Sequence, residues 1–307
     1  MSEFSSMTNI DGVIRPTAEA CVPVMDRGFL YGDSVYEVFR TYSGVALFLA
    51  EHFERLENSA RLISMNISQS RSELLAEIRR TVSQTGVTDR DVFVRYQITR
   101  GVGVVDLYAD PALETTYVII VKQLPEWDQR FRSQGVNMAI PRIRRNPINA
   151  LDPNIKGGNY LNNVLAVTEA RQRGADDCIM LNREGFVTEA SNSNVWFVIR
   201  GELVTPGTGN LSGLTKRALH DALEQRGIES RETEIHVNEL YEATECFITS
   251  ATREVMPVRN LELETGHQFQ FPPGGGDLTR IAVAAYREHI QQYVASHHAD
   301  ALFEFRP

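Results

Sequence analysis

The stretch NPINALDPNIKGGNYLNNVLA, residues 146–166, joins a proline-punctuated loop to an amphipathic run and carries a single lysine, Lys156. The chain has only two other lysines, Lys122 and Lys216, among 31 basic residues, so arginine supplies most of its positive charge. Arginine keeps its proton in proteins, whereas a lysine amine can lose its proton and act as a nucleophile or base. Lys156 is therefore a candidate catalytic residue. The simpler alternative is an arginine-rich composition in which three lysines survive by chance.

Length and composition restrict the class of protein. The 307 residues are 42% hydrophobic and 23% charged, which is typical of a soluble globular chain long enough for two domains. The net charge is −9 without a basic block, so we expect no nucleic-acid partner. The three cysteines lack the spacing of metal ligands, and we expect no metal site. Residues 1–12 do not read as a signal peptide, and no apolar run approaches the eighteen or so residues of a membrane span. We therefore expect a cytoplasmic protein that does not bind membranes.

Helix and strand patterns alternate along the chain without an internal repeat. A turn over 25–34 precedes an expected hairpin, and residues 245–261 are expected to run from a strand into a loop. The spacing of apolar residues predicts helices over 49–65, 70–86, 160–174, 214–227 and 277–296, and strands over 91–101, 115–125 and 135–143. Residues 176–206 are expected to form four strands with a Glu-Gly turn after the first and an Arg-Gly turn before the last. Pro and charged residues mark 123–134 as an interdomain linker between a small α/β domain, 1–122, and a second domain, 135–307. The order predicts an α+β protein whose two domains each have a mainly antiparallel sheet or barrel with flanking helices.

Two places along the chain look suited to an anion. Gly213, Leu214 and Thr215 in SGLTKRAL stand at the expected start of a helix, where N–H groups and the helix dipole favour a phosphate. The hydroxyl-rich run TSATREV, residues 249–255, follows an apolar strand and offers further backbone donors. Each feature is also what an ordinary helix cap or turn requires, so neither identifies a ligand by itself.

Two carboxylates stand in apolar strand contexts, where a charge has to be paired. They are Glu37 in VYEVFR and Glu189 in VTEASNSNVWF. Glu189 precedes a Ser/Asn-rich turn that can open one end of a strand to a ligand; the alternative is an edge-strand glutamate that faces water. The glycine-rich stretches lack the GxGxxG and Walker patterns, so a nucleotide site is not expected.

Taken together, these fragments resemble one family, the fold-type IV (class IV) pyridoxal phosphate enzymes. The family includes branched-chain and D-amino acid aminotransferases, (R)-selective amine transaminases and aminodeoxychorismate lyase. The resemblance runs from about Asp26 to about Val258 and implies the two-domain fold of the D-amino acid aminotransferases. It rests on ordered motifs: DRGFLYGDSVYEVFR, EHFERLENSA, VRYQITRGVG, IKGGNYLNN, GFVTEASNSNVWFV, LSGLTKRAL and TSATREVMPV.

The resemblance implies a role for Lys156. It matches the lysine that binds pyridoxal 5′-phosphate covalently and then moves a proton between the substrate Cα and the cofactor, which arginine could not do. The roles that the resemblance implies at other positions are Arg55 and the helix-start residues Leu214 and Thr215 at the phosphate, Glu189 at the pyridine nitrogen, Tyr160 near the phenolic oxygen, and Leu211 on the ring face.

One position departs from the family pattern at the phosphate. Many relatives have a threonine where this chain has Ala251, so one hydroxyl contact is missing. Ser250, Thr252 or backbone N–H groups can substitute for it. We expect a weaker hold on the cofactor by about 1 kcal/mol, the contribution of one hydrogen bond.

The motifs divide on the substrate. Tyr31, Tyr36, Arg40 and Arg95 resemble the branched-chain aminotransferases, in which matching residues help to bind carboxylates beside an apolar pocket. Phe93 stands where those enzymes commonly have a tyrosine.

Other residues point to D-amino acid aminotransferases. Arg100 matches the arginine of their carboxylate trap, but Val102 replaces the histidine expected two places later. The resemblance favours a ping-pong aminotransferase that uses branched-chain L-amino acids and 2-oxoglutarate. The alternatives are a D-amino acid aminotransferase, an (R)-amine transaminase or lyase, and a non-catalytic cofactor-binding homologue. It also implies a homodimer with a donated loop around GVVDLYAD, residues 103–110, in which Leu107 and Tyr108 are candidate lids.

Overall fold

The computed structural model describes residues 4–306 and divides the chain into two compact units. The first unit contains the described residues up to Pro125, together with 155–159 and those from Gln292 onward. The second unit contains 126–154 and 160–291. Among residues 4–306, no helix has both the length and the apolar character needed to cross a membrane.

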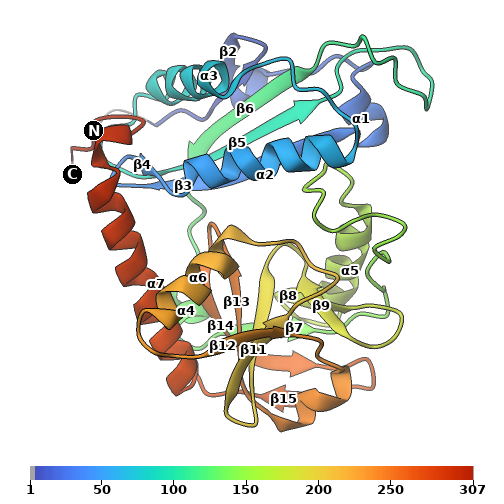
Figure 1. The fold of residues 1–307 in the computed structure, drawn as a ribbon, viewed down its shortest axis with the longest axis vertical. Helices are drawn as coiled ribbons and strands as arrows, with labels where there is room; N and C mark the ends of the chain where they lie inside the picture. The colour runs from blue at the N-terminus through green and yellow to red at the C-terminus, as the bar shows by residue number, and fades with distance from the viewer. Residues whose placement is uncertain (1–3, 307) are drawn as a thin grey trace. The chain divides into compact units, whose positions relative to one another are not determined.

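The first unit is built on one six-stranded antiparallel sheet with strand order β2-β1-β6-β5-β3-β4. Helix α2 runs along β3, and α3 packs against β1 and β6 (Figure 1). Its strands are β1 (Met7–Ile10), β2 (Val13–Pro16), β3 (Ser34–Tyr42), β4 (Val45–Ala46), β5 (Val92–Thr99) and β6 (Thr116–Gln123). Its helices are α1 (Arg27–Tyr31), α2 (Leu49–Leu62), α3 (Arg71–Gln84) and the 3-10 turn η1 (Thr17–Glu19).

Strand β5 shows why the two faces of this sheet differ. Val92, Val94, Tyr96 and Ile98 are buried under the helices, and the residues between them, Phe93, Arg95 and Gln97, are only partly buried. Successive side chains of a strand point to opposite faces. The face away from the helices therefore carries the polar and aromatic residues of interest.

The chain returns twice to the first unit. At 155–158 it lies along the edge of β3: the Tyr36 N–H donates to the Lys156 carbonyl at 2.9 Å, and the Gly158 N–H donates to the Ser34 carbonyl at 2.8 Å. A Cβ at Gly158 would come within 2.2 Å of Ser34 Oγ, so any larger residue there would displace the Ser34 side chain. The second return is the C-terminal segment, where the Leu302 N–H donates to the Gly44 carbonyl.

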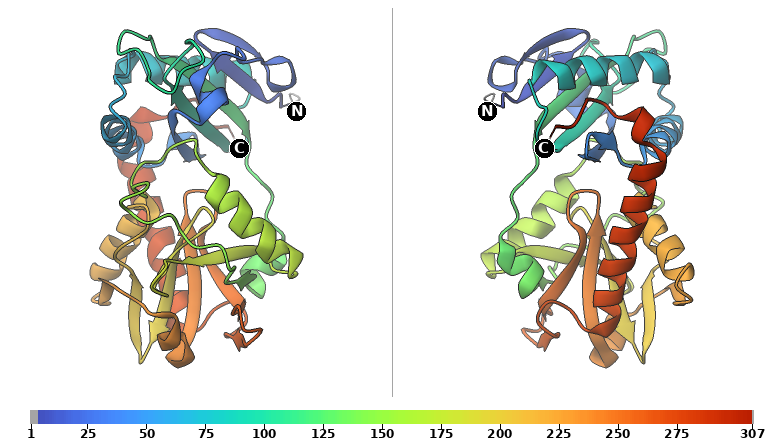
Figure 2. Two further views of the ribbon diagram at one scale, coloured as in Figure 1. Left: turned by 90° about the vertical axis from the view of Figure 1, so that its right-hand side faces the viewer. Right: turned by 90° about the vertical axis from the view of Figure 1, so that its left-hand side faces the viewer.

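The second unit contains a nine-stranded sheet with order β12-β11-β10-β13-β14-β7-β8-β9, and β15 pairs with β14. Helix α5 packs its Ala166 and Ala170 against β7 and β8, and Figure 2 shows it (yellow-green) outside these strands. The strands are β7 (Val136–Ala139), β8 (Asp177–Leu181), β9 (Val187–Ala190), β10 (Asn194–Ile199), β11 (Glu202–Pro206), β12 (Ser230–Thr233), β13 (Ala243–Ser250), β14 (Glu254–Glu262) and β15 (Gln268–Gln270). The helices are α4 (Gln129–Ser133), α5 (Leu161–Gln172), α6 (Leu214–Glu224) and α7 (Asp277–Ser296), with 3-10 turns η2 (Val237–Glu242) and η3 (His298–Asp300).

The predicted α+β class is confirmed, because helices flank mainly antiparallel sheets in both units. Two local predictions were wrong. Residues 254–262 form β14 rather than a loop, since pairing with β13 and β7 stabilises them. Residues 27–31 form helix α1 rather than a turn, because the Asp26 side chain caps the Gly28 N–H at 2.8 Å.

The bounds of the two units differ in detail from the domain bounds predicted from the sequence. The expected linker 123–134 includes α4, and the change of unit falls between Pro125 and Glu126. The expected second domain, 135–307, includes 155–159 and the residues from 292 onward, which the structure assigns to the first unit. A linear pattern does not reveal that a chain comes back to a sheet edge.

Candidate active site

Lys156 is fixed in the first unit by its backbone. Its carbonyl accepts from Tyr36 of β3, and its N–H donates to Ser59 Oγ of α2 at 3.2 Å. Its Nζ lies 4.6 Å from the centroid of the Tyr36 ring. Lys156 is half-buried, and its amine lies against an aromatic face. Within residues 4–306, no carboxylate forms an ion pair with this amine.

Arg55 lies on the same helix and binds a buried carboxylate. Its Nε donates to Glu37 Oε1 and its Nη2 to Glu37 Oε2, both at 2.7 Å. His52 Nδ1 lies 2.7 Å from Glu37 Oε2. Glu37, on β3, is fully buried. The strand pattern had indicated that Glu37 must be paired, and these are its partners.

The charges in this cluster determine its protonation. Burial by itself favours a protonated Glu37, but the Arg55 guanidinium and the His52 ring hold the pKa of this carboxyl well below its usual range. Burial lowers the pKa of His52, against the opposing effect of Glu37, and the charges of Arg55 and Lys156 lower it further. Neutral His52 therefore donates its Nδ1 hydrogen to the Glu37 carboxylate, which can only accept.

Arg95 lies on the sheet face away from the helices, beside Tyr36. Its guanidinium carbon is 3.6 Å from the Tyr36 ring centroid, and its Nη2 donates to Gln97 Oε1 at 2.7 Å. Phe93 is on the same face of β5, where its ring is 4.7 Å from Lys122 Nζ. The charged groups of Arg95 and Lys156 thus both lie against the ring of Tyr36.

The guanidinium of Arg40 contacts a different ring, that of Tyr42, at 4.2 Å from the ring centroid. In the sheet, Arg40 of β3 is the register partner of Phe93 of β5.

Arg100 has a different set of partners. Its Nε donates to Asp33 Oδ2 at 2.7 Å, and its Nη atoms donate to the carbonyls of Ser64 and Ile63 at 3.0 and 2.8 Å. Asp33 Oδ2 also accepts from Arg27 Nε at 3.1 Å. Arg100 is therefore part of a structural network that ties β5 to the end of α2.

Arg27 extends that network to the 103–110 loop. Its Nη1 and Nη2 donate to the carbonyls of Asp106 and Leu107 at 2.6 and 2.9 Å. The side chains of Leu107 and Tyr108 are exposed, and the Tyr31 ring lies 4.9 Å from the Arg27 guanidinium. Sequence reasoning missed Arg27, although it stands in the quoted motif DRGFLYGD.

In the second unit, Glu189 is held at the end of β9. It is only 6% exposed, its Oε1 is 2.8 Å from Arg145 Nη2, and its Oε2 accepts the Leu211 N–H at 3.1 Å. Arg145 Nη1 also donates to Asn163 Oδ1, while its Nε is buried without an acceptor among the described residues. Sequence reasoning missed Arg145, and nothing in its local pattern distinguishes it from Arg144. Tyr160 is the residue that precedes α5 and is partly buried.

No side chain of the described residues caps the start of α6. Its N-cap residue, Gly213, has no side chain to cap the first turn, and a Cβ there would fall 1.9 Å from Asn194 Oδ1. Leu214 and Thr215 are buried first-turn residues, and first-turn N–H groups of a helix have no partner within the helix. The loop before α6 is fixed by Asn194, whose Nδ2 donates to the Leu211 carbonyl.

The turn over 250–253 is fixed from two sides. Trp127 Nε1 donates to the Thr252 carbonyl at 3.2 Å, and its ring lies 5.0 Å from the Arg253 guanidinium. Arg253 pairs with buried Asp177 at 2.6 Å, and its N–H donates to Ser250 Oγ. Ala251 stands between these anchors and contributes no hydroxyl. Trp127 came from the expected linker, so sequence reasoning gave it no role in the site.

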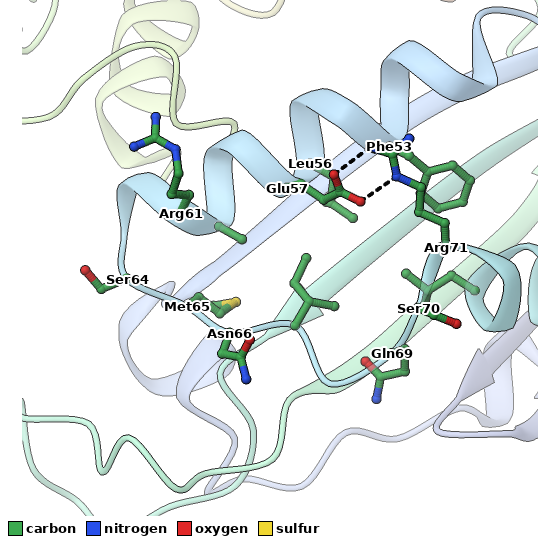
Figure 3. A pocket seen from close by; sticks show the side chains of 13 residues that line it. Phe53, Leu56, Glu57, Arg61, Ser64, Met65, Asn66, Gln69, Ser70 and Arg71 are labelled. Carbon is green, nitrogen blue, oxygen red and sulfur yellow. Dashed lines mark hydrogen bonds and ion pairs between the residues drawn. The ribbon is translucent and has the colours of Figure 1, made fainter.

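A surface pocket of about 500 Å³ lies elsewhere on the first unit. Apolar residues of α2 and α3 line it with the connecting turn 64–70, and Glu57 and Arg71 form an ion pair at its wall (Figure 3). None of the candidate residues of the described chain lines this pocket.

Comparisons with known proteins identify the family. The sequence model of the amino-transferase class IV family matches residues 34–261. A putative branched-chain-amino-acid aminotransferase of Methanocaldococcus jannaschii is 33% identical over 258 residues, 82% of this chain and 87% of that protein. A D-alanine aminotransferase of Listeria monocytogenes is 33% identical over 249 residues, 80% of this chain and 83% of that one.

Solved structures agree. The branched-chain amino acid aminotransferase of Escherichia coli superposes with a TM-score of 0.84 at 27% identity, covering 92% of this chain and 94% of that one. That of Thermoproteus uzoniensis, with norvaline, has a TM-score of 0.83 at 29% identity, covering 95% and 98%. The chain belongs to the class IV aminotransferases. It is therefore a transaminase, and its cofactor is pyridoxal 5′-phosphate.

The residues present fit this cofactor. A phosphate requires cations and N–H donors. Taken by itself, the first unit offers the guanidinium of Arg55, and the second unit offers the first-turn N–H groups of α6. A pyridinium N–H requires a carboxylate, and Glu189 is a buried one whose charge is balanced by Arg145. A carbonyl carbon requires an amine, and Lys156, whose backbone is held by Ser59, could supply one.

Proposed function

We propose that the chain transfers an amino group from branched-chain L-amino acids to 2-oxoglutarate in a ping-pong reaction, with Lys156 as the catalytic residue. The observation that carries this proposal is the grouping of Arg95 and Lys156 around the Tyr36 ring. Glutamate and 2-oxoglutarate differ from the branched-chain substrates by a distal carboxylate. A site for both needs a cation beside apolar surface, which is what Arg95, Tyr36 and Phe93 offer on one sheet face.

The hydrogen-bond partners of the Arg100 guanidinium favour L-amino acids over D-amino acids as substrates. A carboxylate trap at this position needs a guanidinium that can turn to the substrate. Arg100 instead binds Asp33 and two backbone carbonyls, and its neighbour Val102 has no donor side chain. Breaking a charge-assisted pair to bind a substrate carboxylate would offset much of the gain. D-alanine transfer therefore ranks second, although D-alanine aminotransferases are among the relatives.

The proposed mechanism assigns each side chain one task. When bound, pyridoxal phosphate supplies a ring that accepts the electron pair left when the substrate Cα loses its proton. Lys156 takes that proton at Nζ and returns it on the cofactor side. Glu189, with Arg145 balancing its charge, would accept the hydrogen bond of the ring nitrogen, and Arg55, Leu214, Thr215 and the 250–252 turn would hold the phosphate. Tyr160 would contact the phenolic oxygen, and Leu211 would pack on the ring.

We further propose a homodimer. The Gly103 N–H donates to the Met25 carbonyl at 3.3 Å, so the 22–29 and 102–108 segments lie side by side in the first unit. Both segments carry exposed apolar residues, namely Val22, Val24, Met25, Phe29, Val102, Val104, Val105, Leu107 and Tyr108. Exposed apolar residues on neighbouring segments support an interaction surface. Light scattering on Leu107→Ser/Val105→Ser is expected to show a larger monomer fraction than the parent chain.

The test of the substrate is an absorbance spectrum of the holoenzyme after addition of one amino donor without an acceptor. L-leucine is expected to convert the lysine-bound form of the cofactor to its aminated form, whereas D-alanine and (R)-1-phenylethylamine are not. Conversion by D-alanine or the amine alone would refute the branched-chain assignment while keeping the chemistry. A colourless protein that stays colourless with added cofactor would point to a non-catalytic homologue.

A further inference from the structure

The buried carboxylate of Glu37 touches no group that reacts in the mechanism above. It lies on the face of β3 that helix α2 covers, and it is fully buried. Placing a charge there is costly unless donors surround it. Glu37 receives three hydrogen bonds, two from Arg55 and one from His52. A hydrophobic residue would pack this face more simply, so the charge needs a reason.

The geometry of the pair restricts Arg55. The carboxylate accepts from Nε and Nη2 at 2.7 Å each, which is the two-point arrangement that fixes the plane of a guanidinium. His52 contacts Oε2, one of the two oxygens in that arrangement, so it restrains the carboxylate in turn. Arg55 and His52 are three residues apart on α2 and thus share the helix face that meets β3.

We propose that Glu37, itself held by His52, is the positioning residue that orients Arg55 toward the cofactor phosphate; this rests on the phosphate role proposed for Arg55. With one edge of the guanidinium held by Glu37, its remaining N–H groups point in fixed directions. A phosphate then binds without first ordering a flexible arginine.

Glu37 also has an opposite effect on phosphate binding. The direction in which Glu37→Gln changes the phosphate affinity therefore tests the proposal. Its negative charge reduces the positive potential of Arg55. If charge compensation dominated, Glu37→Gln would tighten phosphate binding. If orientation dominates, as proposed, Glu37→Gln weakens it even though the site becomes more positive.

The experiment compares two ligands that differ only by the phosphate. Dissociation constants for pyridoxal 5′-phosphate and pyridoxal are measured by fluorescence titration in the full chain carrying Lys156→Ala, so that no covalent bond contributes. The readout is the ratio of the two affinities. Glu37→Gln is expected to lower this ratio about tenfold, the typical effect of one charged hydrogen bond, in the same direction as Arg55→Leu. Thermal unfolding of the apoprotein is recorded in parallel.

Two further variants separate positioning from folding. His52→Asn keeps an N–H donor near the Nδ1 position and is expected to retain the ratio, whereas His52→Leu is expected to lower it. The matched control is Glu57→Gln, which removes a carboxylate from another two-point arginine pair on α2, that with Arg71. This control is expected to leave the ratio unchanged.

Several outcomes would overturn the proposal. An unchanged or raised ratio in Glu37→Gln would do so, as would an equal loss of affinity for both ligands with a lowered unfolding temperature. If Glu37→Gln does not fold, the two His52 variants decide, and equal ratios in both refute the proposal. A ratio unaffected by Arg55→Leu would instead refute the phosphate role of Arg55. The substrate assignment is tested separately by the donor spectra.

Discussion

Replacing Arg95 with glutamine tests the substrate assignment most directly. The proposed role of Arg95 is to bind the distal carboxylate of glutamate and 2-oxoglutarate, which the branched-chain substrates lack. Arg95→Gln removes the charge and keeps most of the stem that packs on the Tyr36 ring. The variant is therefore expected to lose activity with L-glutamate and to keep activity with L-leucine.

The expected magnitude follows from the contact. Arg95 is half-buried on β5, where its guanidinium already donates to Gln97 and lies on Tyr36, so little reorganisation is needed to bind a substrate. A hydrogen bond to a charged group contributes about 1.5–3 kcal/mol. That range corresponds to a roughly tenfold to hundredfold loss in kcat/KM for L-glutamate relative to L-leucine.

The assay is a half-reaction followed by absorbance, with each donor added separately to the holoenzyme. Lys122→Gln is the matched control, since Lys122 is an exposed cation beside Phe93 on the same sheet. It is expected to leave the ratio of the two donors unchanged because exposed charges are screened. Equal losses with both donors in Arg95→Gln would refute the reasoning, because they would mean that Arg95 meets the α-carboxylate shared by all substrates.

Four further predictions concern the other side chains. Lys156→Ala is expected to abolish turnover while the protein still binds pyridoxal phosphate without a covalent bond; substantial remaining transamination would contradict the role of Lys156. Ala251→Thr supplies the missing hydroxyl and is expected to slow cofactor release by roughly fivefold, about 1 kcal/mol, which stopped-flow trapping of released cofactor measures; an unchanged rate would count against the contact. Arg27→Gln removes the donors that hold the 106 and 107 carbonyls, so it is expected to raise KM for amino donors several-fold with an unaltered cofactor spectrum. Because the pKa of Glu37 is held below its usual range, its contribution to the unfolding free energy is present above the unfolded-state pKa and is lost as pH falls below it. Urea titrations between pH 5 and 3 are therefore expected to show a slope smaller by up to about 1.4 kcal/mol per pH unit in Glu37→Gln than in the parent chain.

The sequence predicted the elements that have a clear periodic pattern. Helices α2 and α3 and strands β5 and β6 match regular apolar spacing, so local pattern and tertiary packing agree there. Strand β14 was missed because the apolar run that follows the 250–253 turn is short and is stabilised by pairing with β7, more than a hundred residues earlier in the chain.

For the site, the sequence indicated which groups need partners but not which partners they have. Glu37 and Glu189 were recognised as carboxylates that must be paired. Their partners, Arg55 with His52 and Arg145, come from 15 to 44 residues away in the chain. In an arginine-rich sequence nothing local selects one guanidinium for a distant carboxylate. Such pairs come from tertiary structure, and this is why Arg145 was not predicted. Arg27 and Trp127 were missed for a related reason, since they donate to backbone carbonyls about 80 and 125 residues away in the chain.

Helix α2 accounts for the position of Lys156 in the first unit. The flanking residues Asn154 and Tyr160 belong to the second unit, yet 155–159 is assigned to the first. Ser59 Oγ accepts the Lys156 N–H and donates to the Arg55 carbonyl, one turn earlier on α2. His52, Arg55 and Ser59 are spaced by three and four residues and so lie on one face of α2. The same helix face thus fixes the proposed phosphate-binding arginine and the backbone of the proposed catalytic lysine, so Ser59→Ala is expected to disturb the position of Lys156 without changing the Glu37–Arg55 pair.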